Sequence, residues 1–202
     1  MTGLTVYGES GSRALRALWM VEECGVDYEH VPTTFMVEAK TPEYKSINPN
    51  GRIPTIDDEG TIIWESMAIN LYLAKKYGGE LGPRDLTEEG HMLKWSFWIM
   101  TEVEKPLLNA LFSAVGMMGV EKDVARAGVQ FLEISDQLDV LNDALNGNDY
   151  LIGDRFTVAD LNVAAVLSWT QIGAFDLSAW PNVAEWLGRC LSRDAAARAR
   201  AL

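Results

Sequence analysis

The sequence lacks several features that mark common classes of protein. Its 202 residues include only two cysteines, Cys24 and Cys190, and no Cys-x-x-Cys pair. This scarcity argues against a disulfide framework or a dithiol redox centre and favours a reducing cytoplasm. Basic residues are also few, since 17 Lys and Arg stand against 29 Asp and Glu, for a formal net charge of −12. A phosphate backbone needs a basic surface, so nucleic acid is not expected as the main partner.

Long apolar runs are missing as well. No stretch is long enough and free enough of charge to span a bilayer, so no membrane association is expected. The first residues lack a basic region followed by an apolar run, so we expect no secretory signal. Nearly half of the residues are nevertheless hydrophobic, enough for the core of one large domain or two modest ones.

The first part of the chain alternates between strand-like and helical patterns. An amphipathic helix is predicted over residues 13–24, where Gly25 ends it, and another helix starts at Ser66, a good N-cap. The pattern as a whole predicts a βαβαββα order, which is thioredoxin-like. The strands are expected at residues 4–7, 28–31, 54–56 and 61–64, and a further short helix at residues 41–45.

The rest of the chain has a helical pattern. Residues 79–86 are rich in helix breakers and mark a linker, which divides the chain into domains at residues 1–78 and 87–202. Helices are predicted over residues 88–115, 121–145, 158–169 and 181–191. The tail from Arg193, rich in Ala and Arg, either forms a last helix or frays. We therefore expect an α+β thioredoxin-like domain followed by an all-α helical bundle.

A turn and two short strands carry the most informative motif. Residues 48–51 form a loop by their Asn-Pro and Asn-Gly chemistry, and Pro54 begins the next apolar run. A cis Ile53–Pro54 bond would leave the Ile53 amide and carbonyl free to pair with an extended peptide. The start of the helix at Ser66 suits a carboxylate, and the neighbouring Glu65 suits an ammonium. Together they predict a site for a small zwitterionic peptide.

These motifs resemble those of the cytosolic glutathione S-transferases, in particular the bacterial-type, theta-like and phi-like members that use serine. The family's Asn-Pro-x-Gly-x-[Ile/Val/Leu]-Pro loop appears as residues 48–54, and its Glu/Gln-Ser-x-Ala-Ile helix start as residues 65–69. Residues 153–160 match its C-terminal signature, so the resemblance runs through the whole chain.

The resemblance implies that a side chain near the first helix holds the glutathione thiol as a thiolate, the nucleophilic form. In theta-like members the catalytic serine lies five residues after an aromatic strand residue and four before a helix arginine. Ser12 has both spacings, measured from Tyr7 and to Arg16. It could also be only the N-cap of its helix. Tyr7 is an alternative, because alpha, mu and pi transferases use a tyrosine near this point, and Ser10 is another.

The resemblance also assigns residues to glutathione. The backbone of Ile53 would pair with the peptide, with Pro54 shaping the site. Glu65 would bind the γ-glutamyl ammonium, and Ser66 with its helix start the γ-glutamyl carboxylate. Arg52 and Lys40 are candidates for the glycyl carboxylate, Lys40 being the weaker.

The function implied is that of a glutathione transferase. Glutathione would be the co-substrate, with no other cofactor and no metal, and the second substrate a small, largely apolar electrophile. A cytoplasmic homodimer is expected. Alternatives are a glutathione-dependent isomerase, dehalogenase, ether-cleaving or peroxide-reducing enzyme, or a non-catalytic interaction module. Cys24 lies at the far end of the first helix, so a thioltransferase mechanism is not expected.

Overall fold

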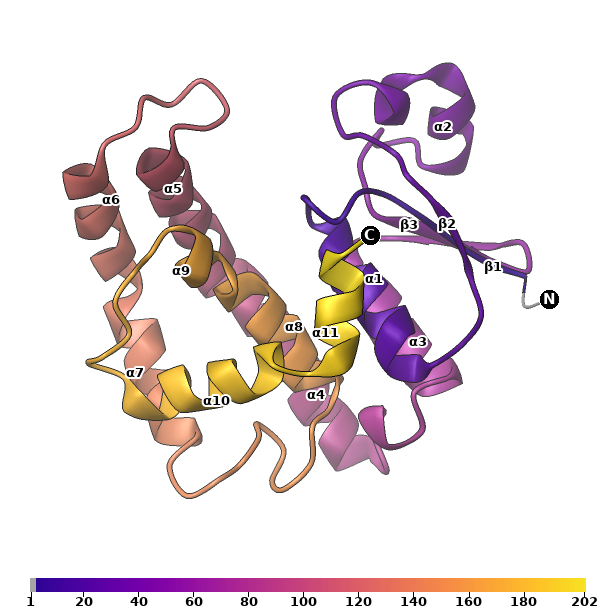
Figure 1. The fold of residues 1–202 in the computed structure, drawn as a ribbon. Helices are drawn as coiled ribbons and strands as arrows, with labels where there is room; N and C mark the ends of the chain where they lie inside the picture. The colour runs from indigo at the N-terminus through magenta and orange to yellow at the C-terminus, as the bar shows by residue number, and fades with distance from the viewer. Residues whose placement is uncertain (1–2) are drawn as a thin grey trace. The chain divides into compact units, whose positions relative to one another are not determined.

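A four-stranded mixed sheet organises the first part of the chain in the computed structural model, which describes residues 3–202 (Figure 1). The strand order is β2-β1-β3-β4, in which β1 runs parallel to β2 and antiparallel to β3. The fourth strand closes an antiparallel hairpin with the third. The strands are β1 (Leu4–Tyr7), β2 (Glu29–Val31), β3 (Thr55–Asp58) and β4 (Thr61–Trp64).

Helices complete the predicted βαβαββα order, so the thioredoxin-like fold is confirmed. They are α1 (Ala14–Cys24), α2 (Pro42–Ile47) with a 3₁₀ turn before it (Glu38–Lys40), and α3 (Ser66–Lys76). Helices α1 and α3 pack against each other and against the sheet, and Leu18, Leu73, Val6 and Ile56 are all buried. Burial of these side chains holds the helices on the sheet. Helix α1 also ends as predicted, at Gly25, which has a left-handed φ of 63°.

The tail of the chain belongs to this first unit. Contacts divide the chain into one unit that contains residues up to Arg84 together with Ser192–Leu202, and a second unit, Asp85–Leu191. The sequence pattern instead predicts that the helical domain includes all of residues 87–202, the tail among them. The tail forms α11 (Asp194–Arg200), which lies beside α1 (Figure 1) and buries Ala195, Ala196 and Ala199. Small side chains let the two helices approach closely.

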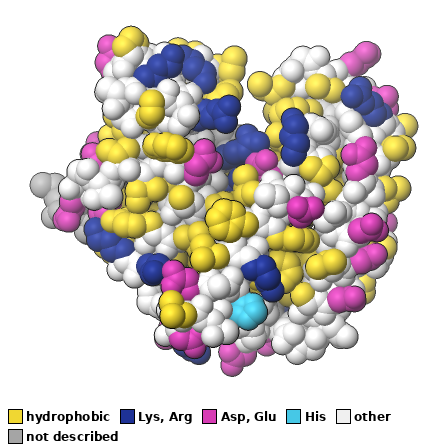
Figure 2. Space-filling view, turned by 180° about the vertical axis from the view of Figure 1, so that it is seen from behind, with side chains coloured by type: hydrophobic (Ala, Val, Ile, Leu, Met, Phe, Trp, Pro, Cys, Tyr) yellow, Lys and Arg dark blue, Asp and Glu magenta, His cyan; other side chains and the backbone are white. Residues whose placement is uncertain are grey.

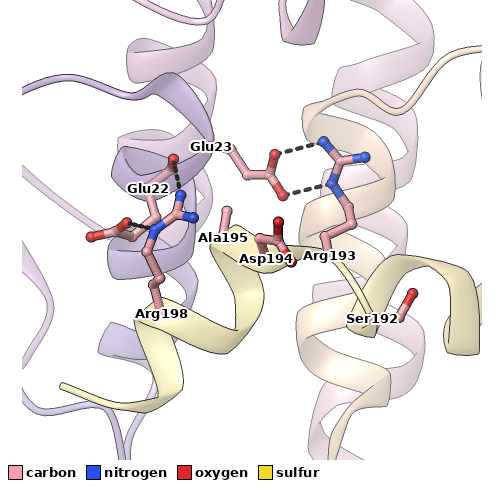
Figure 3. Close-up of a pocket in the computed structure, with 7 residues that line it drawn as sticks. All are labelled: Glu22, Glu23, Ser192, Arg193, Asp194, Ala195 and Arg198. Atoms are coloured by element: carbon pink, nitrogen blue, oxygen red, sulfur yellow. Dashed lines mark hydrogen bonds and ion pairs between the residues drawn. The ribbon is translucent and has the colours of Figure 1, made fainter.

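Two arginines fasten the tail to α1. The guanidinium of Arg193 forms a bidentate pair with Glu23, at 2.7 Å for both bonds. The guanidinium of Arg198 lies 2.6 Å from the Glu22 carboxylate. Figure 3 shows both side chains reaching from the tail across a pocket of about 440 Å³ to α1.

The second unit is entirely helical among its elements of regular structure, which confirms the predicted all-α region. The expected helix over residues 88–115 contains a π-helical turn, and the one over 121–145 starts later and is split by a 3₁₀ turn. The delayed start follows from Asp123, whose side chain accepts from the Arg126 amide and caps the helix there. The elements are α4 (Leu86–Trp98), the π-turn (Ile99–Val103), α5 (Glu104–Val115), α6 (Val124–Phe131), the 3₁₀ turn (Leu132–Ile134), α7 (Ser135–Ala144), α8 (Val158–Leu167), α9 (Trp169–Ile172) and α10 (Pro181–Leu191).

Helix α8 forms the core of this unit, and each of its residues is buried. A capping box stands at its start: the Asp160 carboxylate accepts from the amide and hydroxyl of Thr157. Asp160 also accepts from the indole of Trp186 at 3.0 Å, which ties α10 to α8. The signature at residues 153–160 therefore stabilises the fold of the helical unit.

Candidate active site

The hairpin of β3 and β4 brings the two sequence motifs together. Thr55 pairs with Trp64, so Pro54 and Glu65 lie one step further along their strands at the same end of the hairpin. The Ile53–Pro54 peptide is in the cis form that the sequence allowed. Among residues 3–202, no hydrogen bond occupies the Ile53 amide or carbonyl. Its backbone is therefore available to an extended ligand.

The loop before Pro54 is held by two side chains beneath it. The amide nitrogen of Asn48 donates to the Arg52 carbonyl at 2.8 Å and to the Thr55 hydroxyl at 3.0 Å. The Tyr44 hydroxyl donates to the same carbonyl at 2.8 Å. Gly51 has a φ of 57°, and a β-carbon there would lie 2.8 Å from a backbone oxygen. The sequence identified the loop but missed the supporting role of Tyr44.

Positive charge gathers beside this loop despite the acidic composition. Figure 2 shows Lys and Arg side chains over the part of the first unit that contains α2. The ammonium of Lys40 donates to the Gly51 carbonyl at 2.6 Å and lies over the ring of Phe35. Arg52 is exposed, and none of the described residues binds its guanidinium. Of the two cations proposed for the glycyl carboxylate, Arg52 is therefore more available to a ligand than Lys40, which already contacts Gly51 and Phe35.

The start of α3 has an unusual backbone. Glu65 has a φ of 74°, a value uncommon in residues other than glycine and often found at functional sites. Its carboxylate is exposed and has no protein partner among the described residues. The hydroxyl of Ser66 is buried and accepts from the guanidinium of Arg16 at 3.3 Å. Arg16, which the sequence suggested only by its spacing from Ser12, thus joins the first turn of α1 to the start of α3.

Ser12 lies at the start of α1 and is half-buried. Its hydroxyl donates to the Glu9 carbonyl at 2.8 Å and accepts from the Ala14 amide at 3.0 Å. The N-cap position of α1 is Arg13 and not Ser12, but the Ser12 hydroxyl binds the first amide of the helix. The hydroxyl of Ser10 makes no hydrogen bond within the described residues. To donate to a thiolate, Ser12 would turn its hydrogen away from Glu9 and keep the bond from Ala14.

Tyr7, the remaining candidate, has a less suitable environment. Tyr7 packs against Tyr44 and the small cluster around Ile53. Burial, with the carboxylates of Asp57 and Glu29 adding to it, raises the pKa of Tyr7 above its ordinary value. A tyrosine whose anion is disfavoured is a weaker proton donor.

Cys24 is remote from this chemistry, as the sequence indicated. Burial, followed by the nearby Glu23 carboxylate, raises the pKa of its thiol to about 12. The thiolate, which is the reactive form, is therefore scarce at neutral pH.

Gly8 is where the parts of the site meet. Its φ is 145°, and a β-carbon there would lie 2.3 Å from that of Ala14 and 3.5 Å from that of Ile53. The loop leading to Ser12 therefore leaves β1 directly beside Ile53. Since Arg16 also reaches Ser66, the predicted thiolate loop and the predicted peptide site lie at one end of the sheet.

Two structural absences complete the description. Within residues 3–202, no group of three or more His, Cys, Asp or Glu side chains is placed to hold a metal ion. No helix in the same part of the chain is both long and apolar enough to cross a membrane.

Comparisons with known proteins agree on one family. The protein-family model described as "Glutathione S-transferase, N-terminal domain" matches residues 2–75, and the family model described as "Glutathione S-transferase, C-terminal domain" matches residues 91–194. Glutathione S-transferase D6 of Drosophila melanogaster is 31% identical over 189 residues, which cover 91% of this chain and 85% of the relative.

Solved structures extend the likeness to three dimensions. The theta class glutathione S-transferase from the citrus canker pathogen Xanthomonas axonopodis pv. citri, solved with glutathione bound, is 28% identical with a TM-score of 0.89. The match covers 100% of this chain and 99% of that one. Glutathione S-transferase-I bound with lactoylglutathione is 30% identical with a TM-score of 0.87, and the match covers 98% of each chain.

Proposed function

This chain belongs to the glutathione S-transferase family, and on that premise we propose that Ser12 stabilises the thiolate of bound glutathione for attack on a small, largely apolar electrophile. The observation that carries the proposal is the meeting at Gly8 of the Ser12 loop with Ile53, beside the start of α3. The electrophile class, a homodimer and a cytoplasmic location are inferred from the family.

The polar groups at this end of the sheet suit the two ends of glutathione. The exposed Glu65 carboxylate would bind the γ-glutamyl ammonium, and the free amides at the start of α3, beside Ser66, the γ-glutamyl carboxylate. The open backbone of Ile53 would pair with the cysteinyl residue. Arg52 would bind the glycyl carboxylate, while Lys40 supports the loop and adds positive charge.

The shift in the thiol pKa that Ser12 must help to produce is modest. A thiol with a pKa near 8.5 is mostly protonated at neutral pH, and lowering that pKa by about 2 needs roughly 2.7 kcal/mol of differential stabilisation. The Ala14 amide already donates to the serine oxygen, which makes the hydroxyl a better donor to a sulfur anion. The positive end of α1 acts in the same direction. The thiol proton passes to solvent, and the sulfur then forms a bond to the electrophilic carbon. The carbon either releases a leaving group with its bonding electron pair, or is part of a polarised double bond whose π electrons shift away from it and are then protonated by solvent.

The test is a pH titration of the thiolate absorbance of enzyme-bound glutathione. In the wild type we expect a thiol pKa clearly below that of free glutathione. Ser12→Ala should return it toward the free value, while the matched change Ser10→Ala in the same loop should leave it low. A lowered pKa that survives Ser12→Ala and disappears in Ser10→Ala or Tyr7→Phe would overturn the assignment of Ser12.

A further inference from the structure

A histidine on the neighbouring strand contacts the start of the Ser12 loop. The Nε2 atom of His30, on β2, lies 2.8 Å from the carbonyl oxygen of Gly8. Because a carbonyl can only accept, Nε2 must carry the hydrogen of this bond. The next residue of β2, Val31, accepts from the Gly8 amide at 3.1 Å. Two consecutive residues of β2 thus hold both polar backbone groups of Gly8.

A continuous set of bonds leads from there to the serine. The Gly8 carbonyl belongs to the peptide that joins Gly8 to Glu9, so fixing its direction fixes where the Glu9 backbone begins. The Glu9 carbonyl accepts from the hydroxyl of Ser12 at 2.8 Å and from its amide at 3.1 Å. The Glu9 side chain also accepts from the Phe35 amide at 3.4 Å. The bond from the Ser12 amide remains when the hydroxyl turns from Glu9 to a thiolate, so the placement of Ser12 depends on the Gly8–Glu9 peptide.

On this basis we propose that His30 is a positioning residue for the thiolate, which orients the Gly8–Glu9 peptide so that the Ser12 hydroxyl meets the glutathione sulfur. The inference rests on the proposed function of Ser12. The close packing of Gly8 against Ala14 and Ile53 leaves little room for the loop base to adapt, so a turn of the Gly8 carbonyl would be transmitted to Ser12.

His30 is suited to a test by substitution. Its side chain is partly exposed, and the pairing of β2 with β1 is made by the backbone. Loss of the imidazole should therefore leave the sheet folded while freeing the Gly8 carbonyl. This separates positioning from a general structural role.

The experiment compares three substitutions at His30, with the pKa of bound glutathione and the steady-state constants as readouts. His30→Ala should raise the pKa of the bound thiol by about 1 and lower kcat/KM about 10-fold, mainly through kcat, since small misplacements are costly. His30→Gln should restore most of both, because its amide nitrogen can reach the same carbonyl. The asparagine in His30→Asn is one carbon shorter than glutamine and should not reach the Gly8 carbonyl, so this variant should behave like His30→Ala. His91→Ala, at an exposed site on α4, is the matched control and should match the wild type.

A double mutant separates this inference from the proposed function. If His30 acts through Ser12, His30→Ala should change the thiol pKa much less in a Ser12→Ala background than in the wild type. Equal effects in both backgrounds would show that His30 does not act through Ser12. A normal pKa and kcat in His30→Ala, with Ser12→Ala still raising the pKa, would overturn the inference alone. No effect of Ser12→Ala would overturn the proposed function itself.

Discussion

At the scale of single residues, the geometry of Glu65 is the clearest sign of a binding site. A non-glycine residue with positive φ costs of order 1–3 kcal/mol and persists only where its surroundings impose it. Here the buried Ser66 hydroxyl is fixed to Arg16 directly after it, and the β4 strand ends directly before it. The result is an exposed carboxylate that faces no protein partner among the described residues. Such a group is available to a cation from a ligand.

Replacement of this carboxylate should weaken glutathione binding selectively. For Glu65→Gln we expect the KM for glutathione to rise about 10-fold with kcat changed much less, because a charge-assisted bond to the ammonium becomes a neutral one. Thermal unfolding should be unaffected. Glu59→Gln is the matched control, since Glu59 also has a positive φ, of 55°, and is exposed in the turn of the same hairpin. An unchanged KM in Glu65→Gln would remove Glu65 from the site.

At the scale of elements, a buried carboxylate joins the far end of β3 to α3. Asp58 is 1% exposed and accepts from the hydroxyls of Tyr72 and Tyr77, at 2.7 and 2.8 Å, and from the ammonium of Lys76, at 2.7 Å. Burial by itself would raise the pKa of Asp58, but the three hydrogen bonds outweigh it and hold the pKa below its ordinary 3.8. The helix that carries Ser66 is thus fastened to the sheet at its other end.

The depressed pKa predicts an acid-sensitive contribution to stability. The stabilisation by ionised Asp58 is fully present above the pKa that Asp58 has in the unfolded chain. It is lost as the pH falls below about 4, through the lower pKa that Asp58 has in the folded protein. Asp58→Asn should therefore cost about 2 kcal/mol of unfolding free energy near pH 7, and this difference from the wild type should shrink as the pH falls through that range. Denaturant titrations from pH 7 down to pH 3 measure it.

An exposed carboxylate provides the control for that series. Asp136→Asn, on the surface of α7, should have little effect on the unfolding free energy at any pH. A constant difference between Asp58→Asn and the wild type at all pH values would contradict a depressed pKa at Asp58.

At the scale of the whole molecule, the first structural unit is made of two separate segments of the chain. The first unit is completed by Ser192–Leu202, which follow the whole of the second unit in the sequence. The link depends on Arg193, whose partner Glu23 also accepts from the indole of Trp19 at 2.9 Å. The Glu23 side chain is only 5% exposed. Removing the arginine would leave a nearly buried carboxylate without its charge partner.

Arg193→Ala should therefore destabilise the first unit, by about 2–3 kcal/mol, because unpaired buried charges are costly. We expect faster amide hydrogen exchange in α1, with exchange in α8 of the second unit unchanged. Arg84→Ala, which removes an exposed pair with Glu80, is the control and should cost less than about 0.5 kcal/mol. Faster exchange confined to α8 would show that the tail does not support α1.

Local chemistry explains what could be predicted from the sequence. The loop at residues 48–54 and the helix Pro181–Leu191 depend on residues close together in the chain, and the structure has both of them. The helix expected over residues 121–145 was less accurate, because Asp123 caps it late and a 3₁₀ turn interrupts it. Such details depend on small differences between competing local structures.

The sequence by itself determined the family and the order of the elements, because its motifs, turns, caps and apolar periodicity each act over a few residues. The residues assigned to the peptide site stay a prediction. Only the tertiary structure decided that Arg16 is buried against Ser66, that His30 holds Gly8 and that the tail packs on α1. Those contacts join residues 22 to 176 positions apart in the sequence. Their partners are selected by the packing of the sheet and helices, which no local pattern specifies.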